Sequence, residues 1–271
     1  MDSKTFHIYV ITHKPFPFPL PPHYQKLYVG AARLAPEEKA SLKGYVFDDS
    51  GVNISEKNSS YCELTGLYWL WKNQPDDAIV GITHYRRFFG KPGKYLSIEG
   101  ASRLLQKADM VVARRQWVEK NVKIHFETFH SKEDLCLLRS VIQKKYPEYL
   151  ESFDCAMSKC FLFSYNMMVC RKEVFDAYCV WLFDILEECE GQADLSAYDD
   201  YQKRIFGFLA ERLLLVYLLY HQMKVAEVPV LETELDKSTK WASDKWKMIT
   251  VAKNFFTNRG VGTMRYPGNG R

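Results

Sequence analysis

A short apolar run at residues 78–83 ends abruptly in His84-Tyr85-Arg86-Arg87, and it constrains the fold more than any other stretch. The run is rich in β-branched residues and too short for a typical helix, so it predicts a buried strand. Ligands of open α/β sheets collect at the carboxyl ends of such strands. The histidine and the two arginines therefore predict a site for an anion, most simply a phosphate or a diphosphate. The alternative, that the arginines pair with carboxylates elsewhere on the surface, stays open at this point.

Short strands and helices alternate over the first 113 residues, which indicates an α/β sheet with crossover connections. The predicted strands are 6–12, 27–29, 45–47, 78–83 and 110–113, and the predicted helices are 61–73 and 97–107. Five prolines between residues 15 and 22 predict an extended loop. The second half is mainly helical, with predicted helices at 131–145, 147–153, 173–190 and 201–220 and strands at 165–170 and 225–230.

A capping signal opens the helix predicted at 61–73. Ser60-Tyr61-Cys62-Glu63 matches the capping box, in which a serine N-cap and a glutamate three residues later satisfy each other's backbone amides. The pattern assigns Ser60 as the N-cap and gives Glu63 a structural role. Glu63 is therefore a poor first choice for catalysis.

Composition indicates a globular protein of one α/β domain, with two lobes as the alternative. Its 271 residues lie at the upper end of what one α/β domain holds, and 47% of them are hydrophobic, which is enough for a substantial core. The apolar stretch at 213–220 is far too short to cross a membrane, and no secretory signal is recognisable. The seven cysteines form no CxxC pair, so we expect reduced thiols in a cytoplasmic protein.

The predicted domain spans residues 1–235, and residues 236–271 form a basic aromatic tail. The tail holds eight Lys/Arg and two Asp/Glu, with aromatic residues between them. This mixture is typical of a segment that rests on an anionic membrane surface. It equally fits a tail whose aromatics pack on the body of the protein. No nucleic-acid-binding module accompanies it, so no nucleic-acid partner is predicted.

Several familiar chemistries have no motif in this sequence. The GxGxxG and Walker A fingerprints are absent, which excludes the usual dinucleotide oxidoreductases and P-loop NTPases. No GxSxG elbow marks a serine hydrolase, and no cysteine stands out as a nucleophile. His125 and His130 are five residues apart, a spacing that suits no zinc pair.

The sequence also lacks Asp-x-Asp, the common motif that holds a divalent metal on the diphosphate of a nucleotide-sugar. No cofactor is therefore predicted. A donor diphosphate bound here would rely on cationic side chains, and Arg86, Arg87 and His84 are suitably placed for that role. The alternative that stays open is Mn²⁺ or Mg²⁺ held by the adjacent pair Asp48 and Asp49.

Several separated motifs together resemble one family. They are IYVITHK at 8–14, NISEKN at 53–58, YCELT at 61–65, GITHYRRF at 81–88, YNMM at 165–168, DYQKR at 200–204 and GFLAER at 207–212. This set resembles a glycosyltransferase-like family from bacterial capsular and exopolysaccharide gene clusters, catalogued as a domain of unknown function. The resemblance covers roughly residues 5–232. It implies an α/β fold with a GT-A-like nucleotide-sugar-binding sheet, helices on both faces and a mainly helical second half.

The resemblance also implies roles for individual residues, by element of the predicted site. The donor-binding set is Thr12, His13, Lys14, Asn53, Lys57, Asn58, His84, Tyr85, Arg86 and Arg87. The acceptor-side residues are Tyr165 and Asn166. Glu211 is the candidate base that deprotonates an acceptor hydroxyl, and Asp200 is the competing carboxylate. No residue is predicted to bind a metal.

The expected function is that of a cytoplasmic hexosyltransferase that moves a sugar from a nucleotide donor, in the first place UDP, to a growing glycan. The expected acceptor is lipid-linked, which would give the tail a peripheral contact with the inner membrane face. Two alternatives from other classes remain. One is a non-catalytic nucleotide-sugar or glycan-binding protein of polysaccharide assembly, and the other is a phosphoester hydrolase that uses His84 and the arginines.

Overall fold

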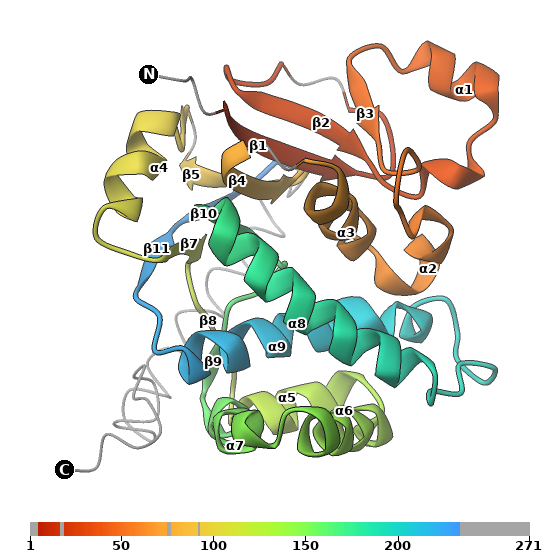
Figure 1. Ribbon diagram of the computed structural model, residues 1–271, viewed down its shortest axis with the longest axis vertical. Helices are drawn as coiled ribbons and strands as arrows, with labels where there is room; N and C mark the ends of the chain where they lie inside the picture. The colour runs from red at the N-terminus through yellow and green to blue at the C-terminus, as the bar shows by residue number, and fades with distance from the viewer. Residues whose placement is uncertain (1–4, 17–18, 75–76, 92, 234–271) are drawn as a thin grey trace.

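A twisted, mostly parallel β-sheet runs through the computed structural model, which describes residues 5–16, 19–74, 77–91 and 93–233 (Figure 1). Its strands are β1 (Thr5–Thr12), β2 (Tyr24–Tyr28), β3 (Tyr45–Phe47), β4 (Asp77–His84), β7 (Met110–Ala113), β10 (Met168–Arg171) and β11 (Val225–Val228). They lie in the order β11-β7-β10-β4-β1-β2-β3. Only β10 runs antiparallel to its neighbours on this path. The predicted α/β class, with helices flanking a parallel-rich sheet, is confirmed.

The pairing of β1 with β4 sets the position of the future site. The two strands are parallel and in register, with Ile11 opposite His84, so their carboxyl ends lie side by side. Gly81 makes this packing possible in the middle of β4. A Cβ at position 81 would lie 2.7 Å from the Ile8 side chain and 3.2 Å from that of Val169, so only glycine fits without displacing a neighbour.

Residues of alternate parity on the strands form two separate cores. Tyr9, Val80 and Ile82 belong to the larger core, on the side of α3 (Leu64–Asn73), α8 (Lys172–Glu190) and α9 (Ile205–Tyr220). Ile8 and Val169 point to the other face, where α4 (Ile98–Leu105) packs. This alternation follows from the two-residue period of a strand and explains why both faces carry helices.

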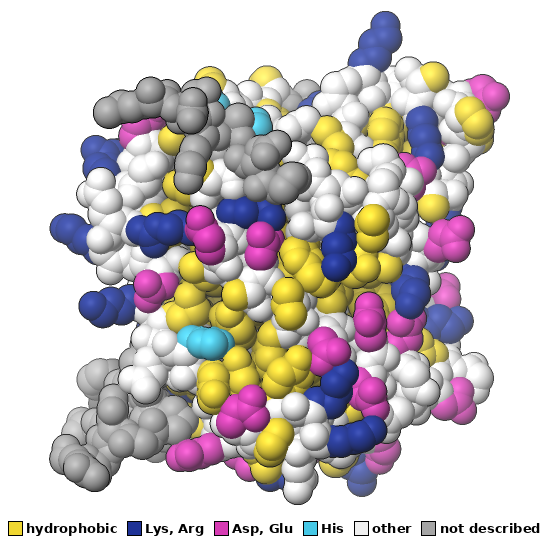
Figure 2. Space-filling view, in the orientation of Figure 1, with side chains coloured by type: hydrophobic (Ala, Val, Ile, Leu, Met, Phe, Trp, Pro, Cys, Tyr) yellow, Lys and Arg dark blue, Asp and Glu magenta, His cyan; other side chains and the backbone are white. Residues whose placement is uncertain are grey.

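A further helical layer lies beyond α8 and α9 and is formed by α5 (Val122–Phe129), α6 (Lys132–Lys145) and α7 (Leu150–Ser158) (Figure 1). Because α9 lies between this layer and the sheet, it is buried on nearly all sides. Figure 2 shows hydrophobic side chains gathered on the face over α8, with charged side chains around them. The mainly helical second half is as predicted.

Short elements complete the described chain. They are η1 (Ala31–Arg33), α1 (Pro36–Ser41), η2 (Ser55–Lys57), α2 (Asn58–Tyr61), β5 (Arg87–Lys91), β6 (Lys94–Tyr95), β8 (Gln116–Trp117), η3 (Pro147–Tyr149), β9 (Phe161–Leu162), η4 (Gln202–Arg204) and β12 (Val230–Glu232). The sequence patterns did not predict β5, which follows β4 after a two-residue turn and pairs with β12. This pairing places Glu232 beside Arg87, the last residue of the His84–Arg87 motif.

The predicted capping box is wrong. A separate short helix, α2, ends at Tyr61, and Cys62 has a positive φ of 52°, so α3 begins only after Glu63. The Ser60 hydroxyl donates to the carbonyl oxygen of Lys57 rather than accepting from an N3 amide. Glu63 occupies the N-cap position, and its side chain bonds to another part of the protein. The four residues have the spacing of a capping box, but the positive φ of Cys62 separates α2 from α3, so the box does not form.

The predicted tail at 236–271 lies outside the described residues, as do residues 17 and 18 of the proline-rich loop. The helices in the described part of the chain are too short or too polar to span a bilayer.

Candidate functional site

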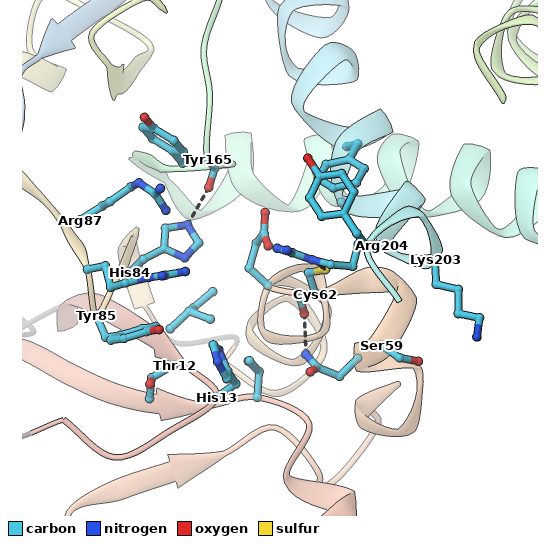
Figure 3. Close-up of a pocket in the computed structure, with 18 of the residues that line it drawn as sticks. Thr12, His13, Ser59, Cys62, His84, Tyr85, Arg87, Tyr165, Lys203 and Arg204 are labelled. Carbon is cyan, nitrogen blue, oxygen red and sulfur yellow. Dashed lines mark hydrogen bonds between the residues drawn. The ribbon is translucent and has the colours of Figure 1, made fainter. Parts of the chain in front are cut away.

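A cavity of about 890 Å³ opens where β1 and β4 end, between the sheet and α9 (Figure 3). Its lining comes from six chain segments: Ile11, Thr12 and His13; Val29 and Arg33; Asn58, Ser59, Cys62 and Glu63; His84, Tyr85, Arg86 and Arg87; Tyr165; and Asp200, Tyr201, Lys203, Arg204, Gly207, Phe208 and Glu211. The position at the carboxyl ends of neighbouring parallel strands is where open α/β sheets bind ligands. The cavity therefore collects most of the predicted site residues.

His84 is held as a neutral side chain at the end of β4. Burial lowers the pKa of its imidazole to about 4. Its Nε2 lies 2.6 Å from the carbonyl oxygen of Tyr165, so Nε2 carries the proton and donates it to this bond (Figure 3). His84 thus fixes the position of Tyr165 and adds no positive charge to the cavity, in contrast to the cationic role expected of it.

Arg87 lies at the start of β5 and faces the cavity beside Tyr165 (Figure 3). Its guanidinium carbon is 4.1 Å from the centre of the Tyr165 ring, a close cation–π contact. Its Nε lies 3.6 Å from Glu232 Oε1 and is buried without a hydrogen-bond partner among the described residues. A guanidinium held in place with unused donor capacity is well suited to an anionic ligand.

Tyr85 and Arg86 form the two-residue turn between β4 and β5. The Tyr85 side chain is buried, and its ring contacts two cations, with Lys14 Nζ and the Arg86 guanidinium carbon each 5.1 Å from the ring centre. The His13 ring packs edge-on against the same tyrosine. Tyr85 therefore organises the positive charge at the ends of β1 and β4.

Tyr165 and Asn166 adopt an unusual backbone conformation, with φ values of 79° and 50°. Left-handed conformations cost non-glycine residues of order 1 kcal/mol each and persist where the surroundings hold them. Here the surroundings are two glutamates. The Tyr165 amide donates to Glu211 Oε1 at 2.7 Å, and Asn166 Nδ2 donates to Glu63 Oε1 at 2.7 Å. The turn is thus fixed by carboxylates from α9 and from the start of α3.

Glu211 is the more completely bonded of the two carboxylates. Its Oε2 accepts from Arg212 Nη1 at 3.0 Å, and Arg212 Nη2 lies 3.2 Å from His125 Nδ1. Burial raises the pKa of Glu211 above its ordinary value, although the Arg212 guanidinium and the Tyr165 amide oppose that shift. The Arg212 side chain is only 2% exposed and is enclosed within the protein, whereas that of Glu211 is 19% exposed and lines the cavity.

Glu63 was given a capping role from the sequence, but in the structure its side chain lines the cavity. Burial raises the pKa of its carboxyl, while the hydrogen bond from Asn166 and the nearby Arg204 act in the opposite direction. Only its tertiary neighbours reveal this environment. The apparent capping box predicted a structural role instead, and no local sequence pattern marks Glu63 as a residue of the cavity.

On the remaining walls, Arg204 and Cys62 were not assigned as site residues from the sequence, whereas Asn58 and Asp200 were. Arg204 Nε donates to Cys62 Sγ at 3.2 Å, and the two side chains meet on the wall opposite His84 (Figure 3). Burial raises the pKa of the Cys62 thiol to about 11, which keeps it protonated. Asn58 Nδ2 donates to the Cys62 carbonyl oxygen at 2.7 Å and thereby fixes this wall. Asp200 lies at the rim, with a fully exposed side chain.

Four predicted site residues do not line the cavity. The Asn53 side chain closes a local turn with Gly51 and Ser55. Lys57 pairs with Glu190 at 2.6 Å. Lys14 lies behind Tyr85. Asn166 is completely buried, so its side chain supports the cavity from beneath.

The Asp48–Asp49 pair has structural partners rather than free carboxylates. Asp48 is fully buried and accepts hydrogen bonds from the amides of Gly30 and Ala31 and from the hydroxyls of Ser55 and Thr65. Asp49 forms an ion pair with Lys39. The alternative metal site predicted for this pair is therefore not supported. Within the described residues, no three His, Cys, Asp or Glu side chains are grouped as metal ligands would be.

Replacement of Glu63 by Gln is expected to change how the stability of the protein depends on pH. The pKa of Glu63 is raised in the folded state, so the folded protein retains the proton to higher pH than the unfolded chain. Its contribution to stability is full below the ordinary pKa of 4.5 and is lost as the pH rises through the folded-state value. The substituted glutamine keeps the acceptor for Asn166 and cannot ionise. The free energy of unfolding of Glu63→Gln should therefore gain on that of the wild type as the pH rises.

Urea unfolding between about pH 4 and about pH 7 measures this difference. The exposed Glu151→Gln on α7 is the matched control. A constant difference between Glu63→Gln and the wild type over the whole range would contradict the described environment of Glu63.

Comparison with known proteins agrees with the fold. Among solved structures, the apo structure of WbbM, a bifunctional glycosyltransferase, matches with a TM-score of 0.74 and 29% sequence identity, over 84% of this chain and 45% of that one. The chain thus spans less than half the length of the WbbM chain. No curated protein matches it. The family model described as a domain of unknown function (DUF4422) matches residues 7–222. Since that range covers most of the chain, the protein belongs to the DUF4422 family.

Proposed function

We propose that this protein is a glycosyltransferase that moves a hexose from a nucleotide donor, UDP in the first place, to a glycan acceptor. One observation carries the proposal: the cavity at the ends of β1 and β4 combines arginines on its walls with two partly buried glutamates on its floor. Sugar transfer needs both parts, because a diphosphate leaves as an acceptor hydroxyl loses its proton. The likeness to a glycosyltransferase of known structure supports this assignment.

In this proposal the donor diphosphate binds to Arg86 and Arg87 at the β4–β5 turn. Arg87 has buried donor capacity that its contacts with Tyr165 and Glu232 do not use. The guanidinium forks match phosphate oxygens and stabilise the charge that develops on the departing nucleoside diphosphate. The nucleoside then extends along the wall of the cavity that holds His13, Arg33 and Asn58. This is the arrangement of a GT-A-like site in which cations supply much of the charge that a metal usually provides.

Glu211 is the proposed catalytic base. Its raised pKa makes it a stronger base than an ordinary carboxylate, and the Tyr165 amide and Arg212 fix its direction. Asp200 is the competing candidate, at the rim of the cavity. The hydrolase alternative requires His84 to transfer a proton, and the bond from Nε2 to the Tyr165 carbonyl oxygen leaves this histidine in a positioning role.

Replacement of Arg87 by Ala is expected to weaken UDP binding about tenfold to a hundredfold, because a charge-assisted bidentate contact is lost. Isothermal calorimetry with UDP in EDTA measures the loss, and a repeat with Mn²⁺ shows how far a metal contributes. Arg139→Ala, which breaks a surface ion pair with Asp154, is the matched control. If the wild-type protein binds no UDP under either condition, the proposed donor site is wrong.

Replacement of Glu211 by Gln is expected to lower turnover at least about a hundredfold while UDP still binds, because Gln keeps the acceptor for the Tyr165 amide and loses the base. Release of UDP from UDP-hexoses is the readout. Asp200→Asn tests the competing carboxylate in the same assay. Full activity in Glu211→Gln would rule out the base assignment, and absence of turnover in a wild-type protein that binds UDP would favour the non-catalytic binding protein.

We further propose that the acceptor is a lipid-linked glycan of capsular, exopolysaccharide or lipopolysaccharide assembly, used at the cytoplasmic membrane face. The composition of residues 236–271, with eight Lys/Arg among aromatic residues, supports a peripheral contact with an anionic surface. Flotation with phosphatidylglycerol-containing liposomes should recover the full-length protein and lose a truncation after Leu235. Equal flotation of the two forms would leave the membrane contact without support.

A further inference from the structure

Three aromatic rings extend the cavity outward along one side. Phe208 on α9 and Tyr201 before η4 both line the cavity, and His130 follows α5. The His130 ring stacks on Phe208 at a centroid distance of 4.1 Å and lies nearly parallel to Tyr201 at 6.0 Å. Tyr201 and Phe208 are 5.2 Å apart. We call His130, Tyr201 and Phe208 the rim aromatics; they pack on one another at the edge of the cavity, and Tyr201 is half exposed.

Hydrogen bonds hold the rim aromatics in place without any ligand. Gln202 Nε2 donates to the carbonyl oxygen of Phe129 at 2.8 Å, and Gln202 Oε1 lies 3.3 Å from His130 Nδ1. Because the Gln202 amide nitrogen already donates to Phe129, its oxygen must accept from a protonated Nδ1 of His130. The Nε2 of a neutral His130 is then an acceptor. The backbone amide of Gln202 also donates to Asp199 Oδ1 at 2.7 Å, which fixes the turn that carries Tyr201.

The chemistry of this surface is mixed rather than simply apolar. The Tyr201 side chain is half exposed, while its immediate neighbours are polar, with Asp200 exposed beside it and Lys203 and Arg204 following. Flat ring faces next to hydrogen-bonding groups match a sugar ring, which has an apolar C–H face and an edge of hydroxyls. An apolar peptide helix would instead require an aliphatic groove, and charged side chains surround this surface.

The acceptor-side residues expected from the sequence leave this role open. Asn166 is completely buried, and both Tyr165 backbone groups are bonded, the amide to Glu211 and the carbonyl oxygen to His84. These residues build the floor of the cavity. The rim aromatics lie on the α9 and η4 side of the same cavity, whereas the arginines proposed for the donor lie on the β4–β5 side.

We infer that the rim aromatics form the acceptor subsite, in which a sugar ring of the glycan stacks on the exposed ring of Tyr201 with a hydroxyl directed to His130 Nε2, while Phe208 supports the other two rings from below. This inference rests on the proposed glycosyltransferase function and names where its acceptor binds. It places the acceptor hydroxyl on the side of the cavity that Glu211 occupies, one helical turn from Phe208 on α9. Asp200 and Lys203 then contact hydroxyls of the glycan at the rim.

Saturation-transfer NMR on the full-length protein tests this subsite, with UDP as the donor-site probe and unlabelled cellobiose, maltose, lactose and diacetylchitobiose as glycan probes. At least one disaccharide should receive saturation through its ring C–H protons in the wild type. Tyr201→Ala should weaken the affinity for that disaccharide about tenfold, and Tyr201→Phe should retain it, because the ring and not the hydroxyl provides the stacking surface. Tyr95→Ala, which removes an exposed ring from β6 outside the cavity, is the matched control and should behave as wild type.

The outcomes separate this inference from the function on which it rests. If UDP receives saturation and the disaccharide binds equally well to the wild type and to Tyr201→Ala, the proposed acceptor subsite is wrong and the donor site is unaffected. Saturation of UDP without any disaccharide signal in the wild type also overturns the subsite. Loss of saturation at the uracil protons in Tyr201→Ala assigns the surface to the nucleobase and again contradicts the inference. No saturation of UDP in the wild type counts against the proposed function itself.

Discussion

The turn at Tyr165 and Asn166 is the constraint on which the rest of the site depends. Both residues have positive φ, and neither is glycine, so the conformation persists only because other groups hold it. Glu211 and Glu63 each bind one residue of the turn, and His84 binds the Tyr165 carbonyl oxygen. These partners come from α9, from the start of α3 and from the end of β4. One short turn therefore joins α9 and the start of α3 to the sheet at the point where the cavity opens.

The turn also determines the electrostatics of the cavity. The two glutamates that accept from the turn lie partly buried on the floor, where desolvation raises the pKa of each carboxyl. The Tyr165 ring supports Arg87 from the other side. Glu63 and Glu211 thus lie on the helical side of the cavity, where Lys203 and Arg204 also line it, and Arg86 and Arg87 lie on the β4–β5 side. The proposed reaction uses both kinds of group, because a leaving diphosphate needs cations and an acceptor hydroxyl needs a base.

The sheet could be predicted from the sequence because its signals are local. The run at 78–83, the β-branched strand before Thr12 and the apolar helices each show a period that survives in the structure. The register of β1 against β4 then brings His13 and the arginines together, as the general rule for ligands at strand ends predicts. Glu211, which lines the cavity, was named as a candidate base through a family resemblance and not through any local pattern.

What could not be predicted depends on contacts between distant residues. Glu63 belongs to a four-residue pattern with the spacing of a capping box. Its position in the cavity depends on the positive φ of Cys62 and on the hydrogen bond from Asn166, and neither can be recognised from the pattern. His84 was expected to be a cation, and its neutrality follows from burial, which outweighs the opposing effect of its bond to the carbonyl oxygen of Tyr165. The Asp48 carboxylate was an open metal candidate until its four donors were known. Spacing carries no information about such partners.

The most direct test of the account is a crystal structure of the protein with UDP. The account predicts the diphosphate at the ends of β1 and β4, within hydrogen-bond distance of the Arg87 guanidinium, with the Tyr165–Asn166 turn unchanged beneath it. A diphosphate bound away from the β4–β5 turn, or a turn that rearranges and releases Glu211, would contradict it.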